Sequence, residues 1–288
     1  MKLILFTTVD FQSRRNAELE RLLQSVALSA AAREGKLFHL LLCQRASSGD
    51  AVEIGNRFKF VQARAIAERV PLSHARNLLL SSTPANPVLE GDGLIGFPDD
   101  DAWYPAGFIE SLLATFKKDN ASLFFCRYGS SPQPWTDERF SQLRPAALRD
   151  AVMYASSNTI FLRTDLARSI GAFDEKLGIG TSIKSGEDTD YAVRAFRAAA
   201  RTIWIDAPMV GHRDANKTLR SNYYAGDLLV VARYARTSLP AFCLFLRKIA
   251  VGAYLAATRQ LSVSDLTRAL AQAAREFCRR RPPTFGAA

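Results

Sequence analysis

The sequence has few cysteines, and their spacing supports neither a disulfide framework nor a zinc ribbon. Cys43, Cys126, Cys243 and Cys278 lie far apart and form no CxxC pair. Three of the four stand in apolar runs, where a buried thiol is ordinary. We therefore expect the protein to occupy a reducing cytoplasm.

Long uncharged apolar segments are also missing. The run from Met1 to Thr8 is too short for a signal peptide and lacks a small-residue cleavage site, so it is predicted to be a strand. The nearest approach to a membrane span, Ala241–Leu261, contains Arg247 and Lys248, each of which costs about 2.5–3.5 kcal/mol near the bilayer centre. Two alternatives stay open for this segment: a helix in the membrane interface, and a helix packed on the rest of the chain.

Acidic residues are scarce at the C-terminal end. The chain carries a net charge of +10, and from Arg213 onward 13 lysines and arginines stand against four acidic residues. A nearly neutral body followed by a basic region predicts an anionic partner for that region, either nucleic acid or a lipid surface. A solvated basic face that only aids solubility is the alternative.

Short apolar runs separated by helical patterns predict an α/β sheet that is covered on both faces. The expected strands are Lys2–Thr8, Lys36–Cys43, Phe58–Gln62, Gly93–Pro98, Ala121–Tyr128, Asn158–Arg163 and Thr202–Asp206. The expected helices are Asn16–Arg33, Ser73–Ser82, Pro105–Phe116, Asp188–Ala200 and Ser264–Arg280, with loops at Ser130–Pro145 and Gly171–Gly186. We expect one domain over residues 1–212 and a basic helical region over 213–288.

Three consecutive acidic residues follow the apolar run Gly93–Pro98. Ligands of open parallel sheets bind at the carboxyl ends of strands, so Asp99, Asp100 and Asp101 stand where a site is expected. The carboxylates of Asp99 and Asp101 can project in one direction, and hard oxygen ligands suit Mg²⁺ or Mn²⁺ shared with substrate phosphates. An acidic cluster that caps the next helix is the alternative.

A second acidic pair, Glu187 and Asp188, begins a predicted helix after a glycine-rich loop. One of these carboxylates can act as a general base on a hydroxyl, although acids at a helix start also complement its macrodipole. His212 follows a strand and is a candidate third metal ligand or a structural hydrogen-bonding residue. Arg76 and Asn77 begin another helix and can bind an anion or a base edge, or form a surface ion pair.

These residues belong to seven segments: the opening strand ending in Thr7 and Thr8, SHARN (73–77), GFPDDDAWYP (96–105), NTIFLR (158–163), IGAFDEKLG (170–178), GEDTDYAVR (186–194) and the histidine of VGH (210–212). In order and spacing they resemble the family 2 glycosyltransferases of the GT-A fold, over roughly residues 3–212. The resemblance implies a nucleotide-binding mixed sheet flanked by helices, here with a C-terminal helical appendage. It also implies inverting transfer of a sugar from a nucleotide-diphosphate sugar.

The resemblance assigns roles to individual residues. Asp99 and Asp101 match the DxD metal site for Mn²⁺ or Mg²⁺, and His212 matches a histidine that completes the metal shell. Asp188 matches the catalytic base, with Glu187 orienting or binding the acceptor. The expected donor-binding residues are Thr7, Thr8, Gln44, Arg76, Asn77, Asp99 and Asp100.

One departure concerns the nucleobase. Many members of the family carry a D-x-G-S-x-D string after the second strand, whereas this strand ends Cys43-Gln44-Arg45. The amide of Gln44 can hydrogen-bond a pyrimidine, but the choice among uridine, thymidine and guanosine donors stays open.

The expected acceptor is a glycan or a lipid-linked glycan, as in bacterial-type polysaccharide, capsule or lipopolysaccharide assembly. An anionic membrane surface is a further expected partner, which would attach a cytoplasmic protein peripherally to the inner face of the membrane; nucleic acid is not expected. Two other classes stay open. A nucleotidyltransferase is expected to have a glycine-rich basic loop after the first strand, and Val9–Arg15 contains no glycine. A catalytically inactive protein that binds nucleotide sugars or anionic polymers is the other.

Overall fold

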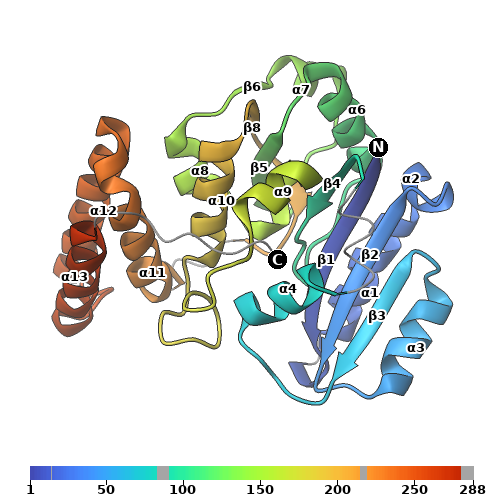
Figure 1. The fold of residues 1–288 in the computed structure, drawn as a ribbon, viewed down its shortest axis with the longest axis horizontal. Coiled ribbons are helices and arrows are strands. Elements are labelled where there is room, and N and C mark those ends of the chain that lie inside the picture. The colour runs from blue at the N-terminus through green and yellow to red at the C-terminus, as the bar shows by residue number, and fades with distance from the viewer. Residues whose placement is uncertain (14, 83–90, 215–218, 280–288) are drawn as a thin grey trace.

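Eight strands form one mixed sheet in the part of the chain that the structure describes (Figure 1). This computed structural model describes residues 1–13, 15–82, 91–214 and 219–279. The strands are β1 (Lys2–Asp10), β2 (Leu37–Gln44), β3 (Val61–Ile66), β4 (Gly93–Gly96), β5 (Leu123–Gly129), β6 (Arg144–Pro145), β7 (Phe161–Arg163) and β8 (Thr202–Gly211). Their order across the sheet is β3-β2-β1-β4-β7-β5-β8-β6.

Helices cover both faces of this sheet. They are α1 (Asn16–Ala27), α2 (Ala30–Arg33), α3 (Ser48–Arg57), α4 (Leu72–Leu80), α6 (Phe108–Asp119), α7 (Asp137–Ser141), α8 (Leu148–Tyr154), α9 (Thr164–Ile170), α10 (Glu187–Ala198), α11 (Leu219–Tyr234), α12 (Leu239–Ala257) and α13 (Val263–Cys278). Short 3-10 turns stand at Phe11–Ser13, Ser157–Thr159 and Ala235–Thr237. The expected mixed α/β sheet flanked by helices, with helices at the C-terminal end, is confirmed.

The strand directions bring several strand ends to one edge of the sheet. β1 is parallel to β2 and β4, and β2 is parallel to β3. β7 runs antiparallel to its neighbours β4 and β5, and β8 is parallel to β5. The carboxyl ends of β1, β2 and β4 therefore open on the same side, where ligands of open sheets bind.

The alternation of side chains along β1 builds two core layers. Ile4 and Phe6 pack with residues of α4, α9 and α10 on one face, and Leu3 and Leu5 pack with residues of α1 and α6 on the other. Successive side chains of a strand point to opposite faces, so a strand covered on both faces needs apolar residues at every position. This requirement explains the unbroken apolar run at the start of the sequence.

Most expected elements are present, but several boundaries were wrong. The third strand begins at Val61 instead of Phe58, because the Phe58 backbone N–H donates to the carbonyl of Ile54 and ends α3. α6 begins at Phe108 and not at Pro105, because Gly107 precedes it in the left-handed region at φ 78°. The expected strand from Asn158 begins only at Phe161, after a 3-10 turn.

Other segments hold more structure than the sequence analysis assigned. The expected loop Ser130–Pro145 contains α7 and β6, and α3, α8 and α9 were not predicted. The last strand continues past Asp206 to Gly211, so that it ends directly before His212. This extension decides where the histidine lies.

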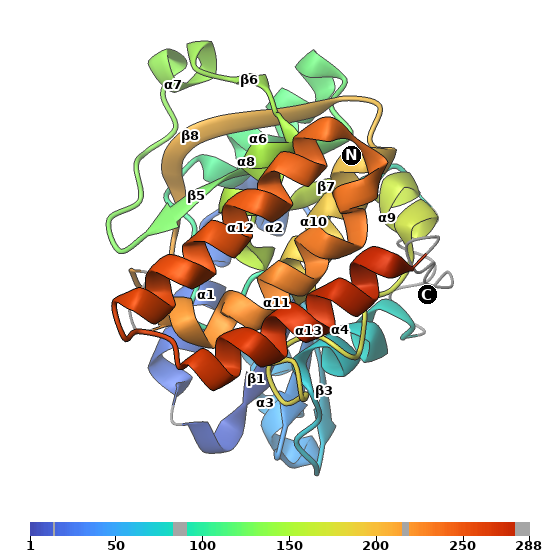
Figure 2. The ribbon, with the colours of Figure 1, turned by 90° about the vertical axis from the view of Figure 1, so that its left-hand side faces the viewer.

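The C-terminal helices form a small core of their own. α11 lies against α10, and α12 and α13 lie on its outer side, as Figures 1 and 2 both show. Tyr224 and Leu228 of α11 pack there with Leu255 of α12 and Ala273 of α13. Leu266, Leu270 and Phe277 of α13 also face this core. Lys217, Arg280 and Arg281 of the basic region lie outside the described residues.

A buried arginine joins these helices to the body. Arg233 of α11 donates to Asp190 of α10 (Nη1 to Oδ1, 2.8 Å), to Asp174 (Nη2 to Oδ2, 3.0 Å) and to Glu276 of α13 (Nε to Oε2, 3.3 Å). Burial alone would lower the pKa of the guanidinium, but Asp190, Asp174 and Glu276 raise it above its usual value. Arg233 thus contacts three carboxylates from different parts of the chain, of which Asp190 also pairs with Arg194 and Glu276 with Arg279.

We expect Arg233→Met to lower the free energy of unfolding by about 3–5 kcal/mol, because it leaves buried Asp174 without its cation and removes one of the two cations that pair with Asp190 and with Glu276. Urea denaturation measures the loss. Arg236→Met is the matched control: Arg236 is exposed and is three residues away, so its replacement should change stability by less than about 0.5 kcal/mol. Equal losses in the two variants would contradict this account of Arg233.

His39 makes folding stability depend on pH. The ring is fully buried, its Nε2 lies 2.9 Å from Oγ1 of Thr7, and burial lowers the pKa of the imidazole to about 3. The unfolded chain binds a proton at this residue near pH 6.5, and the folded chain does not. The stabilising contribution is therefore complete above pH 6.5 and is lost as the pH falls toward 3.

His39→Gln keeps a donor for Thr7 but cannot titrate. We expect the free energy of unfolding of this variant to fall less steeply with acidification than that of the unchanged protein. Below the unfolded-state pKa of histidine, the two slopes should differ by about 1.4 kcal/mol per pH unit. Urea unfolding of both proteins over a series of pH values tests this. Parallel stability curves for the two proteins would show that His39 does not titrate in this way.

Candidate active site

A cavity of about 450 Å³ opens at the carboxyl ends of β1, β2 and β4. The polar residues after those strands line it, together with the first residues of α10 and two residues of α11. Residues on both sides of position 212 therefore contribute to the same cavity.

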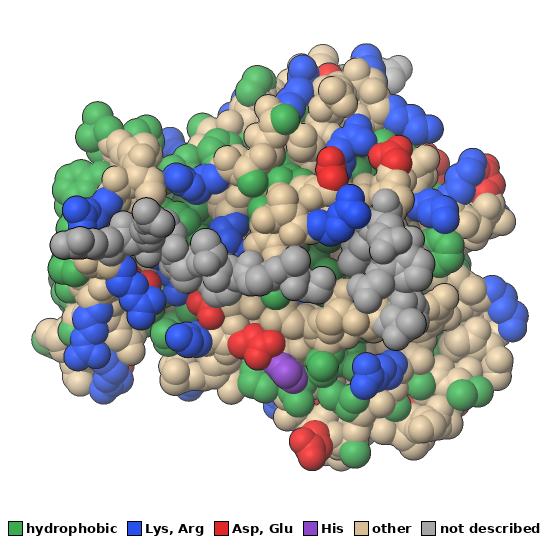
Figure 3. Space-filling model, in the orientation of Figure 1, with side chains coloured by type: hydrophobic (Ala, Val, Ile, Leu, Met, Phe, Trp, Pro, Cys, Tyr) green, Lys and Arg blue, Asp and Glu red, His purple; other side chains and the backbone are tan. Residues whose placement is uncertain are grey.

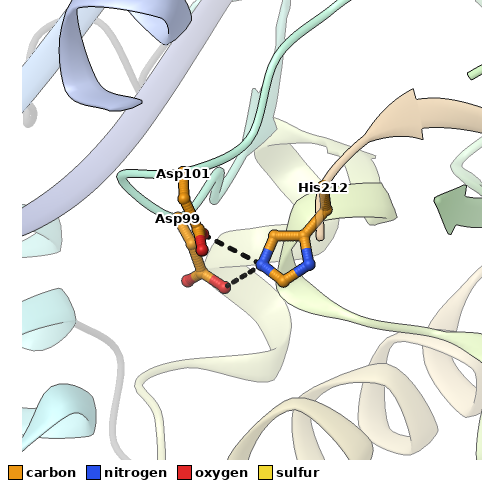
Figure 4. Close-up of side chains that lie close together, drawn as sticks. All are labelled: Asp99, Asp101 and His212. Carbon is orange, nitrogen blue, oxygen red and sulfur yellow. Dashed lines mark ion pairs between the residues drawn. The ribbon is translucent and has the colours of Figure 1, made fainter. Parts of the chain in front are cut away.

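Two carboxylates and an imidazole converge at this cavity (Figure 4). Nε2 of His212 lies 2.9 Å from Oδ1 of Asp101 and 4.0 Å from Oδ2 of Asp99. The possible ligand atoms of the three residues all lie within 4.8 Å of one another. The structure thus brings together the three residues that the sequence analysis assigned to a metal.

An antiparallel bridge between Trp103 and Gly211 sets this distance. Each backbone N–H donates to the carbonyl of the other residue, at 2.9 and 2.8 Å, and so fixes the segment after the aspartates against the end of β8. A Cβ at position 211 would lie 2.1 Å from the indole ring of Trp103. Glycine is therefore required immediately before the histidine.

The hydrogen bonds of His212 fit a metal ligand. Nδ1 lies 2.9 Å from the carbonyl oxygen of Arg213, which can only accept, so Nδ1 carries a proton. The neutral ring then presents the lone pair of Nε2 to the carboxylates. Oδ1 of Asp101 is buried, and its only possible hydrogen-bond donor among the described residues is this ring when protonated. A proton or a cation is needed between the two atoms, and a carboxylate–imidazole set suits Mn²⁺ or Mg²⁺.

The pKa shifts of this cluster show the same need for positive charge. Burial lowers the pKa of His212, but the hydrogen bond to Asp101 and the charges of Asp101 and Asp99 raise it above its usual value. For Asp101, burial acts to raise the pKa, and His212, Arg213 and Arg15 together lower it. Without a metal, a protonated ring would supply the missing charge.

Asp100 faces a different partner from its two neighbours. Its Oδ1 accepts from Nη1 of Arg15 at 3.0 Å, and the side chain is buried. Burial raises the pKa of Asp100 to about 6 in spite of this arginine. Asp100 is therefore held outside the three-residue cluster and lines the cavity.

Arg76 links the two acidic groups. Its Nη1 donates to Oδ1 of Asp188 at 2.7 Å, and its Nη2 donates to Oδ1 of Asp99 at 3.1 Å and to Oγ of Ser157 at 2.8 Å. The guanidinium is 3% exposed, so its charge acts on both carboxylates with little screening by water. The arginine therefore holds Asp99 and Asp188 on either side of itself at the cavity wall.

Asp188 and Glu187 differ in their surroundings. Both oxygens of Asp188 accept hydrogen bonds, from Arg76 and from the backbone N–H of Ser157 at 2.9 Å, as an ionised carboxylate does. Glu187 is buried, and burial followed by the charge of Asp188 raises its pKa to about 8. With this pKa the Glu187 carboxyl group is largely protonated at neutral pH and can donate a hydrogen bond.

The other expected donor-binding residues divide into two sets. Thr8 and Gln44 line the cavity, and Oε1 of Gln44 accepts from the Val70 backbone at 2.8 Å, which leaves its amide NH₂ as a donor. Thr7 is fully buried and donates to the carbonyl of Pro98 at 2.8 Å.

Asn77 is likewise engaged inside the fold. It binds the backbone of Phe173 through both of its amide atoms, at 3.0 and 2.8 Å. The side chains of Thr7 and Asn77 thus position neighbouring segments and do not line the cavity.

Several residues of the site were not singled out from the sequence. Oδ1 of Asn158 accepts a hydrogen bond from the backbone N–H of Asp99 at 2.6 Å, and its Nδ2 donates to Oδ2 of Asp99 at 3.0 Å. Asn158 therefore fixes this carboxylate. Its place in the NTIFLR segment was a signal that could have been used. Arg15, and Tyr223 and Asp227 of α11, carry no local pattern, because only the folded chain brings them to the cavity.

The fold of this chain is similar to that of solved structures of S. aureus TarS. No family model matches the sequence, and no curated protein matches it. The fold is similar to that of S. aureus TarS residues 1–349 in complex with UDP, with a TM-score of 0.69 at 14% identity over 96% of this chain and 81% of that one. For the complex of TarS 1–349 with UDP-GlcNAc the TM-score is 0.57 at 13% identity, over 96% of this chain and 89% of that one.

A further TarS structure has a longer chain. It matches 86% of this chain with a TM-score of 0.62 at 15% identity, and the present chain covers 43% of its length. At these identities the similarity establishes the fold, and the site itself must support any activity.

Proposed function

We propose that the protein is a metal-dependent, inverting glycosyltransferase that moves a sugar from a nucleotide-diphosphate sugar to a hydroxyl of a glycan or lipid-linked acceptor. One observation carries the proposal. Buried Arg76 holds Asp99, a member of the carboxylate–imidazole cluster, on one side and Asp188 on the other, within one cavity at the carboxyl edge of the sheet. In this proposal, the departing diphosphate would bind beside Asp99, and the attacking hydroxyl would bind beside Asp188.

The donor in this proposal is a uridine diphosphate sugar. Solved TarS structures with this fold contain UDP and UDP-GlcNAc. The free NH₂ of Gln44 suits a carbonyl oxygen of a pyrimidine, and Thr8 stands beside it in the cavity wall. Asp100 and Arg76 line the same cavity.

In the proposed single displacement, different residues of the chain have different roles. Asp188 takes the proton of the acceptor hydroxyl as its oxygen forms a bond to the anomeric carbon, while the bond from that carbon to the diphosphate oxygen breaks on the opposite face. The anomeric centre is inverted and UDP leaves. A divalent cation bound by Asp99, Asp101 and His212 would neutralise charge on the leaving diphosphate. Protonated Glu187 can donate to the acceptor and orient it.

A panel of nucleotide sugars, screened with and without manganese, tests the proposal. Ligand binding to the folded state raises its stability by mass action, by about 2.7 kcal/mol at a ligand concentration of 100 times Kd. We expect manganese-dependent thermal stabilisation by UDP sugars, accompanied by slow release of UDP. Stabilisation without any release or transfer would indicate a binding protein instead of an enzyme, and no stabilisation by any nucleotide sugar would refute the proposal.

A further inference from the structure

The outer face of α12 is apolar and uncovered. Residues spaced along one side of this helix are exposed: Leu239, Phe242, Leu246, Ala250, Ala253 and Tyr254. Leu239 is 74% exposed, Leu246 48% and Tyr254 62%. Figure 2 shows α12 facing the viewer beside α13, and Figure 3 shows hydrophobic side chains gathered at this end of the molecule. Over its 19 residues the face extends about 28 Å.

By length and composition, α12 is also the one helix in the described ranges that could cross a membrane, with 22% of it buried. The helix packs on α11 through its opposite side, which carries Ala241, Gly252 and Leu255. Arg247 is charged and lies among its exposed residues. A helix that is packed on one side and apolar on the other is suited to lie along an interface.

A groove of about 780 Å³ runs beside this face, between α8, α10 and α12. Its floor is apolar, with Leu148, Phe196 and Leu244 among the lining residues. Arg149 of α8, Arg197 of α10 and Arg247 of α12 stand around it, and all three are exposed. Cations thus border an apolar surface on three separate elements.

These three arginines form no ion pair within 4 Å among the described residues, although the charge of Arg149 helps to lower the pKa of Asp150. Arg197 donates to the hydroxyl of Thr237 at 2.8 Å, and Arg247 contacts the sulfur of Met153 at 2.9 Å. Asp150, the residue after Arg149, is bound by both terminal nitrogens of Arg144. The groove therefore carries uncompensated positive charge next to an exposed apolar face.

We propose that the outer face of α12 and this groove dock on a bilayer that contains anionic phospholipid. The apolar side chains would enter the acyl boundary, and the three arginines would bind lipid phosphates. A second copy of the chain fits this surface poorly, because a two-fold contact would bring the same unpaired arginines against each other. The proposal concerns a surface outside the active site and holds whether or not sugar transfer occurs.

Docking through α12 would also place the cavity near the lipid. Nζ of Lys248, on the side of α12 toward the body, lies 2.7 Å from Oδ2 of Asp227, which lines the cavity. Met153, the contact of Arg247, lines it as well. Residues of α12 at or beside the proposed docking surface thus contact residues of α8 and α11 that line the proposed active site.

Co-sedimentation of the full chain with vesicles tests the proposal. Phosphatidylcholine vesicles are compared with vesicles that also contain phosphatidylglycerol, at low and at high salt. We expect binding to the anionic vesicles that weakens as salt rises. Arg149→Gln with Arg247→Gln should weaken this binding about 25-fold, since each arginine near a charged surface contributes about fivefold. Leu239→Gln with Leu246→Gln should weaken it at least about tenfold, through lost apolar insertion.

Two control pairs match these variants on other parts of the surface. Lys59→Gln with Arg64→Gln removes the same charge from exposed positions in and before β3. Leu28→Gln with Val52→Gln removes two exposed apolar side chains near α1 and α3. We expect both control pairs to bind as the unchanged protein does. Thermal unfolding of all variants confirms that each is folded.

Equal vesicle binding by the test and control pairs would overturn the proposal. So would an absence of vesicle binding together with a dimer, in sedimentation velocity without lipid, that the Leu239→Gln and Leu246→Gln pair dissociates. Because these measurements use no nucleotide sugar, their failure is distinguishable from failure of the proposed enzyme activity.

Discussion

Asp188→Asn is expected to lower sugar transfer by about 10²–10⁴-fold while manganese-dependent binding of the donor is retained. Asp188 is the carboxylate that can accept a proton at the acceptor side of the cavity, and an amide cannot replace it in that role. The substitution leaves Asp99, Asp101 and His212 unchanged, so the binding of metal and diphosphate should persist. Transfer kinetics and thermal stabilisation by UDP with manganese, measured on the same preparation, separate the two effects.

This substitution also removes a charge that balances Arg76, so a control must separate loss of the base from loss of geometry. Ser157→Ala removes only the hydroxyl that accepts from Nη2 of Arg76 and leaves the backbone N–H that binds Asp188. We expect this variant to lose far less transfer than Asp188→Asn. Normal turnover of the Asp188→Asn protein would rule out Asp188 as the base.

Asp101→Asn is expected to abolish the manganese dependence of UDP binding and to lower transfer by at least about 100-fold, which is the scale of one strong electrostatic contact to a developing charge. The buried Oδ1 of Asp101 faces Nε2 of His212, and an amide at this position cannot supply the second carboxylate of the cluster. Calorimetric titration with UDP, with and without manganese, measures the loss directly.

The neighbouring residue gives the matched control. Asp100→Asn makes the same chemical change one position away, but Asp100 pairs with Arg15 and lies outside the cluster. We expect this variant to keep the manganese dependence, with an altered affinity for the nucleotide. If the two variants lose the manganese dependence equally, the assignment of Asp101 over Asp100 as a metal ligand is wrong.

The position of Arg76 explains how the loss of transfer in Asp188→Asn and the loss of manganese dependence in Asp101→Asn can arise in one cavity and still be separated. A buried guanidinium between Asp99 and Asp188 keeps like charges from opposing each other directly, and each carboxylate uses a different nitrogen of the fork. Lysine at this position would present a single point charge and could not hold both acids in this geometry. The planar fork is the physical reason for arginine here.

The sequence determined the strands of the parallel half and the place of the acidic triplet. β1, β2 and β4 are covered on both faces, so most of their residues are apolar at successive positions, and polar residues gather toward the carboxyl ends. The pattern was weaker where the elements are short or partly exposed. β3 was placed too early, and α8 and α9 were not found, because seven residues hold too little periodicity to distinguish a helix from a loop.

Tertiary structure alone decided what each polar residue does. Alternation along β1 turns Thr7 into the core and Thr8 to the cavity. The partners of Thr7 come from elsewhere in the chain: His39 lies in β2, and Pro98 follows β4. Asp99, Asp100 and Asp101 are identical in the sequence, yet Arg76, Arg15 and His212 give them three different environments.

The triplet could be predicted to lie at a strand end because the buried strand before it appears in the sequence as a continuous apolar run. The division of its roles rests on charges that the chain brings together over long sequence separations. The electrostatic energy of each carboxylate depends on those distances and on burial, and neither is encoded next to the residue itself.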